Sequence, residues 1–239
     1  MAVPPDGRLD EEAKGLLRLI VERQAYRQRM AANIRGHGLK FLPDLAAKLR
    51  VTEELAESLR RLATLEEIYE AIGGIDLTAR VMSRMERIPY PATRLELAAC
   101  LALTGRAERA VASTYARCPC QRFARLAGEL QAADRTHDAG EEERFVVFAA
   151  DPPNRVQAQR YWERWLTLCL QSLGRPGTPG DERAYALGLR DRRAADLVAL
   201  FIEEVEPLRA AGGLDWPDLA RRGVDLPRTL TQRMRGEGA

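Results

Sequence analysis

The residues of this sequence that are best suited to chemistry are Asp134 and His137, which lie within residues 123–148. At helical spacing, this stretch places Phe123, Leu130 and Phe145 on one broad face, and the acid and the histidine fall on the same face. In helix bundles, an inward acid and histidine three positions apart typically bind a metal in a dinuclear iron or manganese centre. The pair therefore raises the question of a metal site.

A dinuclear centre needs more ligands than this pair supplies. It requires carboxylates from two further helices and a second acid and histidine pair. The only other histidine is His37, which lies between two glycines near the end of the first predicted helix and has no acid nearby in sequence. A symmetric centre is therefore not expected. The simpler interpretations of Asp134 and His137 are a hydrogen-bonded polar pair inside the bundle, a single remaining metal site, or a pair exposed to solvent.

Length and composition describe an ordinary globular protein. The 239 residues suffice for a substantial core without disulfides, and 37 basic against 35 acidic residues leave a net charge of +2, which disfavours a nucleic-acid binder. No secretory signal and no membrane-spanning apolar run is recognisable, so we expect a cytoplasmic protein without a membrane role. The four cysteines are expected to be reduced, and Cys118-Pro-Cys120 is spaced too tightly for a zinc pair of the usual kind.

Hydrophobic periodicity predicts an all-α fold with helices over residues 10–42, 52–72, 93–116, 123–148 and 155–173, and a short helix within 78–87. Thr52 is the predicted N-cap of the second helix, and Gly73-Gly74 its end. The glycines at 36 and 38 are expected to loosen the end of the first helix. The third helix is rich in alanine, so neighbours can approach it closely and we expect it at the centre.

Side-chain positions follow from the same periodicity. The second helix is predicted to point Leu55, Leu59, Leu62, Leu65 and Ile68 inward. Trp162 and Trp165 are predicted to lie in the core or at an interface, whereas the three glutamates at 141–143 are predicted to form a solvated face. The predicted organisation is an N-terminal arm (1–9), a helical bundle (10–173), a Gly/Pro-rich linker (174–180), and C-terminal helices with a tail (181–239).

The order of four motifs resembles that of the ferritin-like phenylacetyl-CoA epoxidase family over residues 15–176. These motifs are Gly38-Leu-Lys-Phe-Leu-Pro-Asp44, Tyr69-Glu-Ala-Ile-Gly-Gly74, Asp134-x-x-His137-x-x-Gly140, and Asp151-Pro followed by a tryptophan-rich helix. Members of this family are subunits of a multicomponent bacterial oxygenase in phenylacetic acid catabolism. The resemblance implies a ferritin-like antiparallel helical bundle, here with additional C-terminal helices.

The resemblance also assigns positions to the metal ligands, which in the catalytic subunit are a carboxylate on the first and third helices and Glu-x-x-His on the second and fourth. The matching positions are Gln28 (alternative Glu22), Glu57 with Arg60 or Ser58 with Arg61, Thr104 (alternatives Glu108 and Glu96), and Asp134 with His137. Arginine replaces histidine in either register of the second helix, and a guanidinium offers only donors and cannot ligate a metal. The di-iron site is therefore expected to be degenerate.

If one of these arginines points inward, its positive charge would neutralise the carboxylates of Glu57 and Asp134. It would then take the place of the positive charge of the metal ions. Without the resemblance, Glu57 with Arg60 or Arg61 is more simply a surface ion pair at helical spacing.

Three functions follow from these patterns. The first is a non-catalytic structural or regulatory subunit without a cofactor, which forms a homodimer or a hetero-oligomer with a catalytic homologue. The alternative is an iron-dependent monooxygenase for an acyl-CoA or small aromatic substrate, with Glu57, Asp134 and His137, helped by Glu108, holding one metal. The third is a dimerising scaffold whose polar core pair is incidental.

Overall fold

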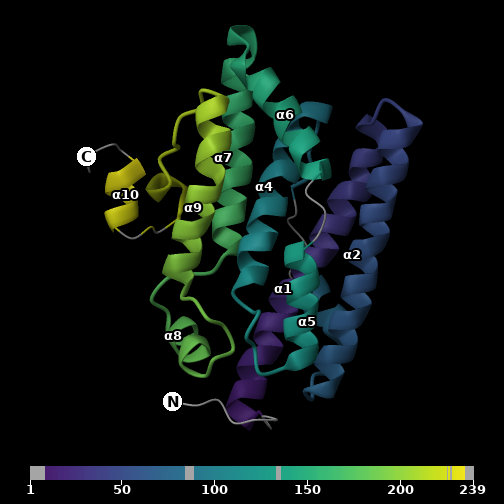
Figure 1. The fold of residues 1–239 in the computed structure, drawn as a ribbon, viewed down its shortest axis with the longest axis vertical. Coiled ribbons are helices and arrows are strands. Elements are labelled where there is room, and N and C mark those ends of the chain that lie inside the picture. Colours follow the sequence, from purple (N-terminus) through teal and green to yellow (C-terminus); the bar gives the residue numbers. More distant parts are fainter. Residues whose placement is uncertain (1–8, 84–88, 133–135, 225, 227, 235–239) are drawn as a thin grey trace.

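The computed structural model describes residues 9–83, 89–132, 136–224, 226 and 228–234; the side chains of residues 136–139, 228, 229 and 233 lie outside this description. The described residues form helices and contain no β-strand, which confirms the predicted all-α class (Figure 1). The α-helices are α1 (Glu11–Gly38), α2 (Leu45–Ala71), α3 (Leu77–Met82), α4 (Arg94–Ser113), α5 (Gln121–Ala132), α6 (Thr136–Ala150), α7 (Arg155–Ser172), α8 (Pro179–Ala186), α9 (Ala194–Ala211) and α10 (Arg228–Met234). Short 3-10 turns lie at Leu39–Phe41, Pro152–Asn154 and Ala220–Arg222.

Helix α4 lies at the centre of the molecule, as its alanine content predicted. It packs against α1, α5, α6, α7 and α9 (Figure 1). Every residue from Leu97 to Leu103 is buried, so this part of the helix is covered on all sides rather than along one stripe. The small side chains of α4 allow the surrounding helices to approach it closely.

Helices α1 and α2 form an antiparallel pair. Tyr69 on α2 donates a hydrogen bond of 2.8 Å to Glu22 on α1, and at the other end Arg35 donates one of 3.0 Å to Glu54. Helix α2 ends where predicted, because Gly73 adopts a positive φ of 80° that favours glycine.

The start of α2 differs from the prediction, which placed the N-cap at Thr52. The helix begins about two turns earlier than that, at Leu45, because the Asp44 carboxylate accepts the Ala47 N–H at 2.7 Å and caps it there. The Thr52 hydroxyl instead donates to the Lys48 carbonyl at 2.8 Å inside the helix. The prediction that Leu59 points inward is also wrong, because the buried stripe of α2 runs through Ser58 and leaves Leu59 48% exposed.

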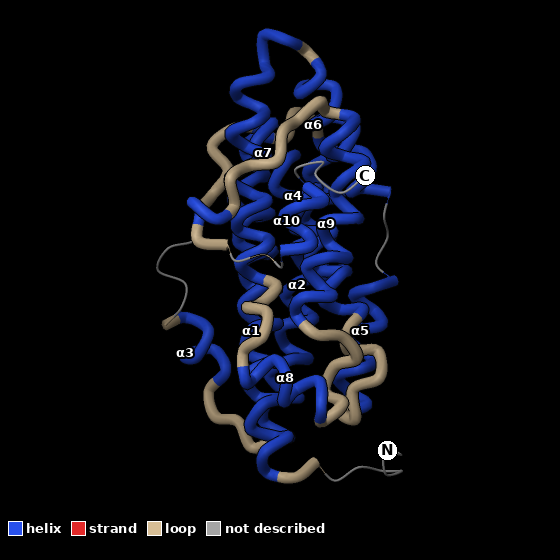
Figure 2. The backbone as a smooth tube through the Cα atoms, turned by 90° about the vertical axis from the view of Figure 1, so that its left-hand side faces the viewer, coloured by secondary structure: helices blue, strands red, loops and turns tan. Residues whose placement is uncertain are grey.

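Helix α4 runs antiparallel to α1 and therefore parallel to α2. Gly38 at the end of α1 lies against Leu97 near the start of α4, and Gln28 contacts Glu108 further along. The chain between α2 and α4 must consequently return along the length of the molecule, and α3 lies on this connection (Figure 2). Gly38 does not loosen α1 as predicted, because the helix continues through it and uses the missing side chain for this close approach.

Two helices, α5 and α6, replace the single helix predicted over residues 123–148. Each has its own buried stripe, which includes Phe123 and Leu130 on α5 and Phe145 and Ala149 on α6. The stripe of α6 also contains Glu141, so the prediction of a fully solvated acidic face is wrong.

Glu141 is only 5% exposed because Arg94 on α4 donates two hydrogen bonds of 2.6 Å to its carboxylate. Arg106, about three turns further along α4, donates from its Nε to the Glu142 carboxylate at 2.8 Å. A bidentate guanidinium supplies the hydrogen bonds and the charge that water would otherwise provide. These ion pairs fix α6 on α4.

The C-terminal helices share the core of the bundle. Helix α9 packs on α4 and α6, and α8 packs on α1. Pro179 and Gly180, predicted as linker, form the first turn of α8. Trp162 and Trp165 of α7 are fully buried, which confirms a core position.

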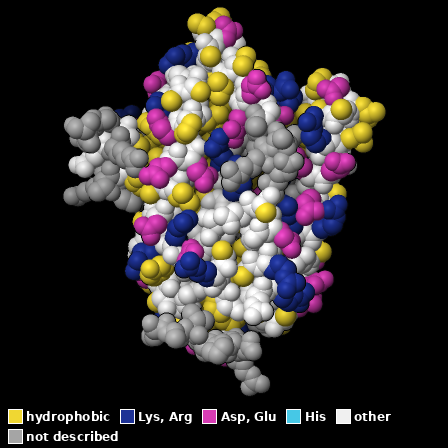
Figure 3. Space-filling view, in the orientation of Figure 1, with side chains coloured by type: hydrophobic (Ala, Val, Ile, Leu, Met, Phe, Trp, Pro, Cys, Tyr) yellow, Lys and Arg dark blue, Asp and Glu magenta, His cyan; other side chains and the backbone are white. Residues whose placement is uncertain are grey.

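The outer surface mixes charges of both signs. Acidic and basic side chains are interspersed over the face shown in Figure 3, in keeping with the net charge of +2. Within the described part of the chain, none of the helices combines the length and the apolarity that crossing a membrane requires.

Replacing Gly38 with alanine should destabilise the protein by about 1–3 kcal/mol, the usual cost of overpacking. A methyl group there would lie 2.7 Å from Cδ2 of Leu97, which is itself fully buried. The matched control is Gly128→Ala in α5, where a methyl group meets no atom within 4 Å and alanine should stabilise the helix by about 0.5–1 kcal/mol. Urea unfolding followed by circular dichroism measures both. A Gly38→Ala protein as stable as the wild type would contradict the close approach of α1 and α4.

Candidate functional site

The residue predicted on the first helix, Gln28, is fully buried on the face of α1 that also buries Leu17 and Val21. Its side-chain amide donates a hydrogen bond to Glu108 on α4, and its Oε1 has no hydrogen-bond partner. This contact joins α1 to α4 inside the bundle. The contact is therefore that of a structural polar pair.

Thr104, the position first matched on the third helix, takes no part in this contact. Its hydroxyl donates to the Cys100 carbonyl of its own helix at 2.7 Å. This back-bonding within α4 satisfies the hydroxyl locally. Of the positions proposed on the third helix, Glu108 is therefore the one that faces Gln28.

On the second helix, Glu57 forms ion pairs with both Arg60 and Arg61. The Arg61 Nε lies 3.2 Å from Glu57 Oε1, and the Arg61 side chain is 15% exposed, whereas that of Glu57 is 39% exposed. The hydrogen bond from Arg60 lowers the pKa of Glu57, although partial burial opposes the shift. Arg61 is thus the more buried of the two arginines, and it pairs with a half-exposed carboxylate.

These positions lie at a similar level of the bundle. Glu22 on α1 faces Tyr69 on α2 and Arg35 faces Glu54, so Gln28 lies level with the turn of α2 that contains Arg61. The polar groups discussed here are the Gln28 amide, the carboxylates of Glu57 and Glu108, and the guanidinium groups of Arg60 and Arg61.

The alternative ligands have structural roles of their own. Glu22 is buried and accepts the Tyr69 hydroxyl; burial and this carboxylate both raise the pKa of Tyr69. Ser58 is buried, and its hydroxyl donates to the Glu54 carbonyl at 3.0 Å.

Glu96 on α4 is also buried, and it accepts three hydrogen bonds. The donors are Arg164 at 2.8 Å, the Trp165 indole at 3.3 Å and the Ala92 backbone N–H at 2.8 Å. Because its two oxygens are already occupied, Glu96 joins α7 to the start of α4 rather than facing an open site.

Two predicted site residues cannot be placed. Asp134 lies outside the described residues, and His137 belongs to α6 but its side chain lies outside the description. The other histidine, His37, contacts the Pro91 carbonyl through Nε2 at 3.1 Å and stacks on Tyr90 with ring centroids 4.8 Å apart. It therefore fixes the end of α1 against the segment before α4.

Among the described residues, no group of three or more His, Cys, Asp or Glu side chains converges in a way that could hold a metal ion. Glu108 is engaged by an amide, and Glu57 is turned to two guanidinium groups. Of the cysteines, Cys118 and Cys169 are buried, which raises the pKa of both thiols to about 12 and makes them poor ligands and nucleophiles.

Two neighbouring cavities lie beside the predicted positions, and sequence reasoning missed them. The smaller, of about 270 Å³, is bounded by α1, α4 and α7 and includes Thr104 and Glu108 in its wall. The larger, of about 760 Å³, lies between α1 and α8. Arg23 and Arg27, one turn apart on α1, line the larger cavity. The spacing of these two arginines could have been recognised in the sequence as one basic helix face. The rest of the wall comes from segments far from α1 in the sequence and could not.

Comparison with known proteins assigns no family. No family model matches the chain, and a search of curated proteins finds no match.

Replacing Glu57 with glutamine should lower the free energy of unfolding by less than about 1 kcal/mol near pH 7, because the pair is partly exposed and screened by solvent. The folded-state pKa of Glu57 is lowered, so its contribution is present above the unfolded pKa and is lost as pH falls towards the folded pKa. Urea unfolding of both proteins between pH 7 and pH 3 should show the difference shrinking on acidification. A difference that grows instead would contradict the assigned ion pairs.

Proposed function

We propose that this chain is a non-catalytic helical-bundle subunit, structural or regulatory, in which polar pairs replace the ligands of a dinuclear iron site. The observation that carries the proposal is the hydrogen bond from the buried amide of Gln28 to the Glu108 carboxylate. It supports a core held together by hydrogen bonding where the resemblance places metal ligands. The arginines on Glu57 support the same conclusion, because they provide positive charge without a metal.

The directions of the helices support a ferritin-like bundle. Helix α2 runs antiparallel to α1, and α4 runs parallel to α2, with residues 72–93 forming a long return connection between them. One long crossover connection distinguishes ferritin-like bundles from simple up-and-down bundles. In this proposal α1, α2, α4, the α5–α6 segment and α7 form the bundle, and α8 to α10 are the additional C-terminal helices.

The proposal includes association with a second subunit, either another copy or a catalytic homologue. Leu45, Leu49 and Leu59 are large apolar side chains exposed on one side of α2. Exposed apolar side chains that gather on one helix face are typical of protein interfaces. A cytoplasmic location is also part of the proposal, and the four free cysteines support it.

Metal analysis tests the proposal directly. Protein purified from iron-supplemented medium should contain iron well below one atom per chain by inductively coupled plasma mass spectrometry. The reason is that Gln28 and Arg61 provide no anionic ligand at the positions assigned to them. Stoichiometric iron would overturn the proposal in favour of an iron-dependent monooxygenase for an acyl-CoA or aromatic substrate.

A double-mutant cycle tests whether Gln28 and Glu108 act as a structural pair. Glu108→Ala should lower the free energy of unfolding by about 1–3 kcal/mol, because it leaves the buried Gln28 amide without its acceptor. The double variant Gln28→Leu/Glu108→Ala should recover part of this loss, with a coupling energy of at least about 0.5 kcal/mol by chemical denaturation. Additive effects of the two substitutions would show that the residues do not form a structural pair.

A further inference from the structure

The two cavities differ in character but share a wall. Tyr26, Arg27, Gln171 and Ser172 line both of them, so the cavities are adjacent. The smaller one is mainly apolar: its wall includes Met30, Ile34, Leu101, Ala107, Trp165 and Leu168. The larger one is lined by four arginines, Arg23, Arg27, Arg175 and Arg190.

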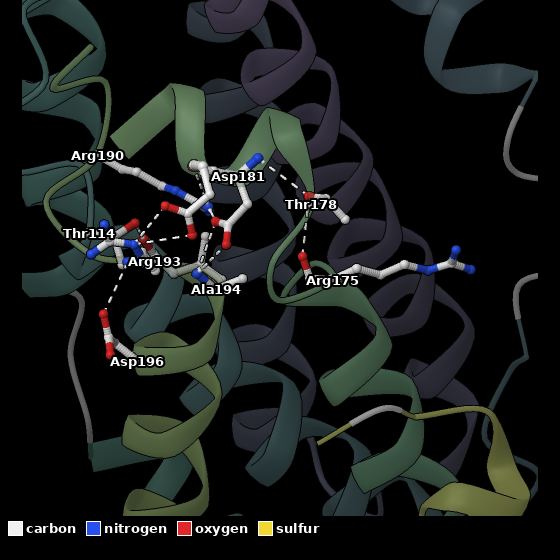
Figure 4. Close-up of polar contacts among 10 residues, drawn as sticks. Thr114, Arg175, Thr178, Asp181, Arg190, Arg193, Ala194 and Asp196 are labelled. Carbon is white, nitrogen blue, oxygen red and sulfur yellow. Dashed lines mark hydrogen bonds and ion pairs between the residues drawn. The ribbon is translucent and has the colours of Figure 1, made fainter. Parts of the chain in front are cut away.

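The carboxylate of the larger cavity cannot balance these charges. Among its described lining residues the acid is Asp181, which is buried and forms an ion pair with Arg190. Both Asp181 oxygens also accept the Ala194 N–H, at 3.0 and 3.2 Å (Figure 4). The side chain of Arg175 extends away from this cluster (Figure 4). Asp181 therefore holds α8 to the start of α9, and its negative charge is neutralised by Arg190.

Arg27 stands where the two cavities meet, and its bonding partners are neutral. It donates to the Ser172 carbonyl at 2.7 Å and to the Gln24 amide oxygen at 3.2 Å. Its Nε is buried without a hydrogen-bond partner. Burial lowers the pKa of Arg27, although the nearby Glu108 carboxylate in the wall of the smaller cavity opposes the shift, and the guanidinium remains charged at neutral pH. An anion at this point would supply the missing acceptor.

We propose that the two cavities form one binding site for an organic anion with an apolar tail. A carboxylate or phosphate head group binds Arg27 and Arg23 in the larger cavity, and the tail lies beside Trp165 and Leu168 in the smaller one. Paired guanidinium groups suit either head group, and the combined size of the cavities suits a small organic ligand. The proposal goes beyond the proposed function, because the site requires neither a metal nor a partner subunit.

Isothermal titration calorimetry on the full chain tests the ligand class. Decanoate and decyl phosphate should each bind saturably below the concentration at which they aggregate, and the tighter of the two identifies the head group. Decanol, which has the tail without the charge, and inorganic phosphate, which has the charge without the tail, should each bind at least about tenfold more weakly. Equal binding of decanol or of inorganic phosphate, or no saturable binding of either tailed anion, would overturn the proposal.

Variants locate the site. Arg27→Gln should weaken binding of the tailed anion at least about tenfold, which corresponds to about 1.4 kcal/mol. Arg23→Gln changes an exposed residue of the same cavity, so its expected loss of affinity does not depend on the stability of the core. The matched control is Arg160→Gln on α7, an exposed arginine outside both cavities, which should bind like the wild type.

A further variant tests the position of the tail. Leu168→Trp should fill the apolar cavity and weaken decanoate binding at least about tenfold, while circular dichroism shows an unchanged helical fold. Wild-type affinity in both arginine variants, or in Leu168→Trp, would place the ligand elsewhere and overturn the proposal.

Discussion

Close packing around α4 is the constraint on which the arrangement of the other helices depends. Five helices contact α4, and its residues from Leu97 to Leu103 are covered on all sides. Small residues on both sides of the contact make this approach possible. Alanines line α4, and on α1 Gly38 lies directly against Leu97. Burial on all sides leaves no solvated face for polar groups in this part of α4, so the charged residues that anchor its neighbours lie before and after it, towards the two ends of the helix. Arg94, Glu96, Arg106 and Glu108 occupy these positions.

Each of these end residues is matched by a group on another helix. Arg94 and Arg106 bind the glutamates of α6, Glu96 binds α7, and Glu108 accepts from Gln28 on α1. A buried charge is tolerated when hydrogen bonds and an opposite charge accompany it, and breaking such a pair costs more than its net contribution. These contacts therefore specify which helix lies where, while the hydrophobic core provides most of the stability.

The sequence predicted the helices more reliably than their polar contacts. Periodicity and glycine located the end of α2, and alanine content placed α4 at the centre, because both depend on local composition. The start of α2 was missed because Asp44 competes with Thr52 as a cap, and sequence alone does not rank two good capping residues. Glu141 was predicted to be solvated because its partner, Arg94, is 47 residues away. Long-range pairing of this kind also decided that Gln28 faces Glu108.

The cavities follow from the same small side chains that allow close packing. Where the surrounding helices contact α4, its alanines let them approach closely. Beyond Leu103, the wall of the smaller cavity includes Gly105 and Ala107, which are too small to fill the space towards α1 and α7. Arg27 projects from α1 beside this space and meets neutral acceptors. Larger apolar residues at these positions would fill the space and pack the core more closely. The combination of an unfilled apolar space and a guanidinium whose buried Nε has no hydrogen-bond partner is what favours a ligand over a packing defect.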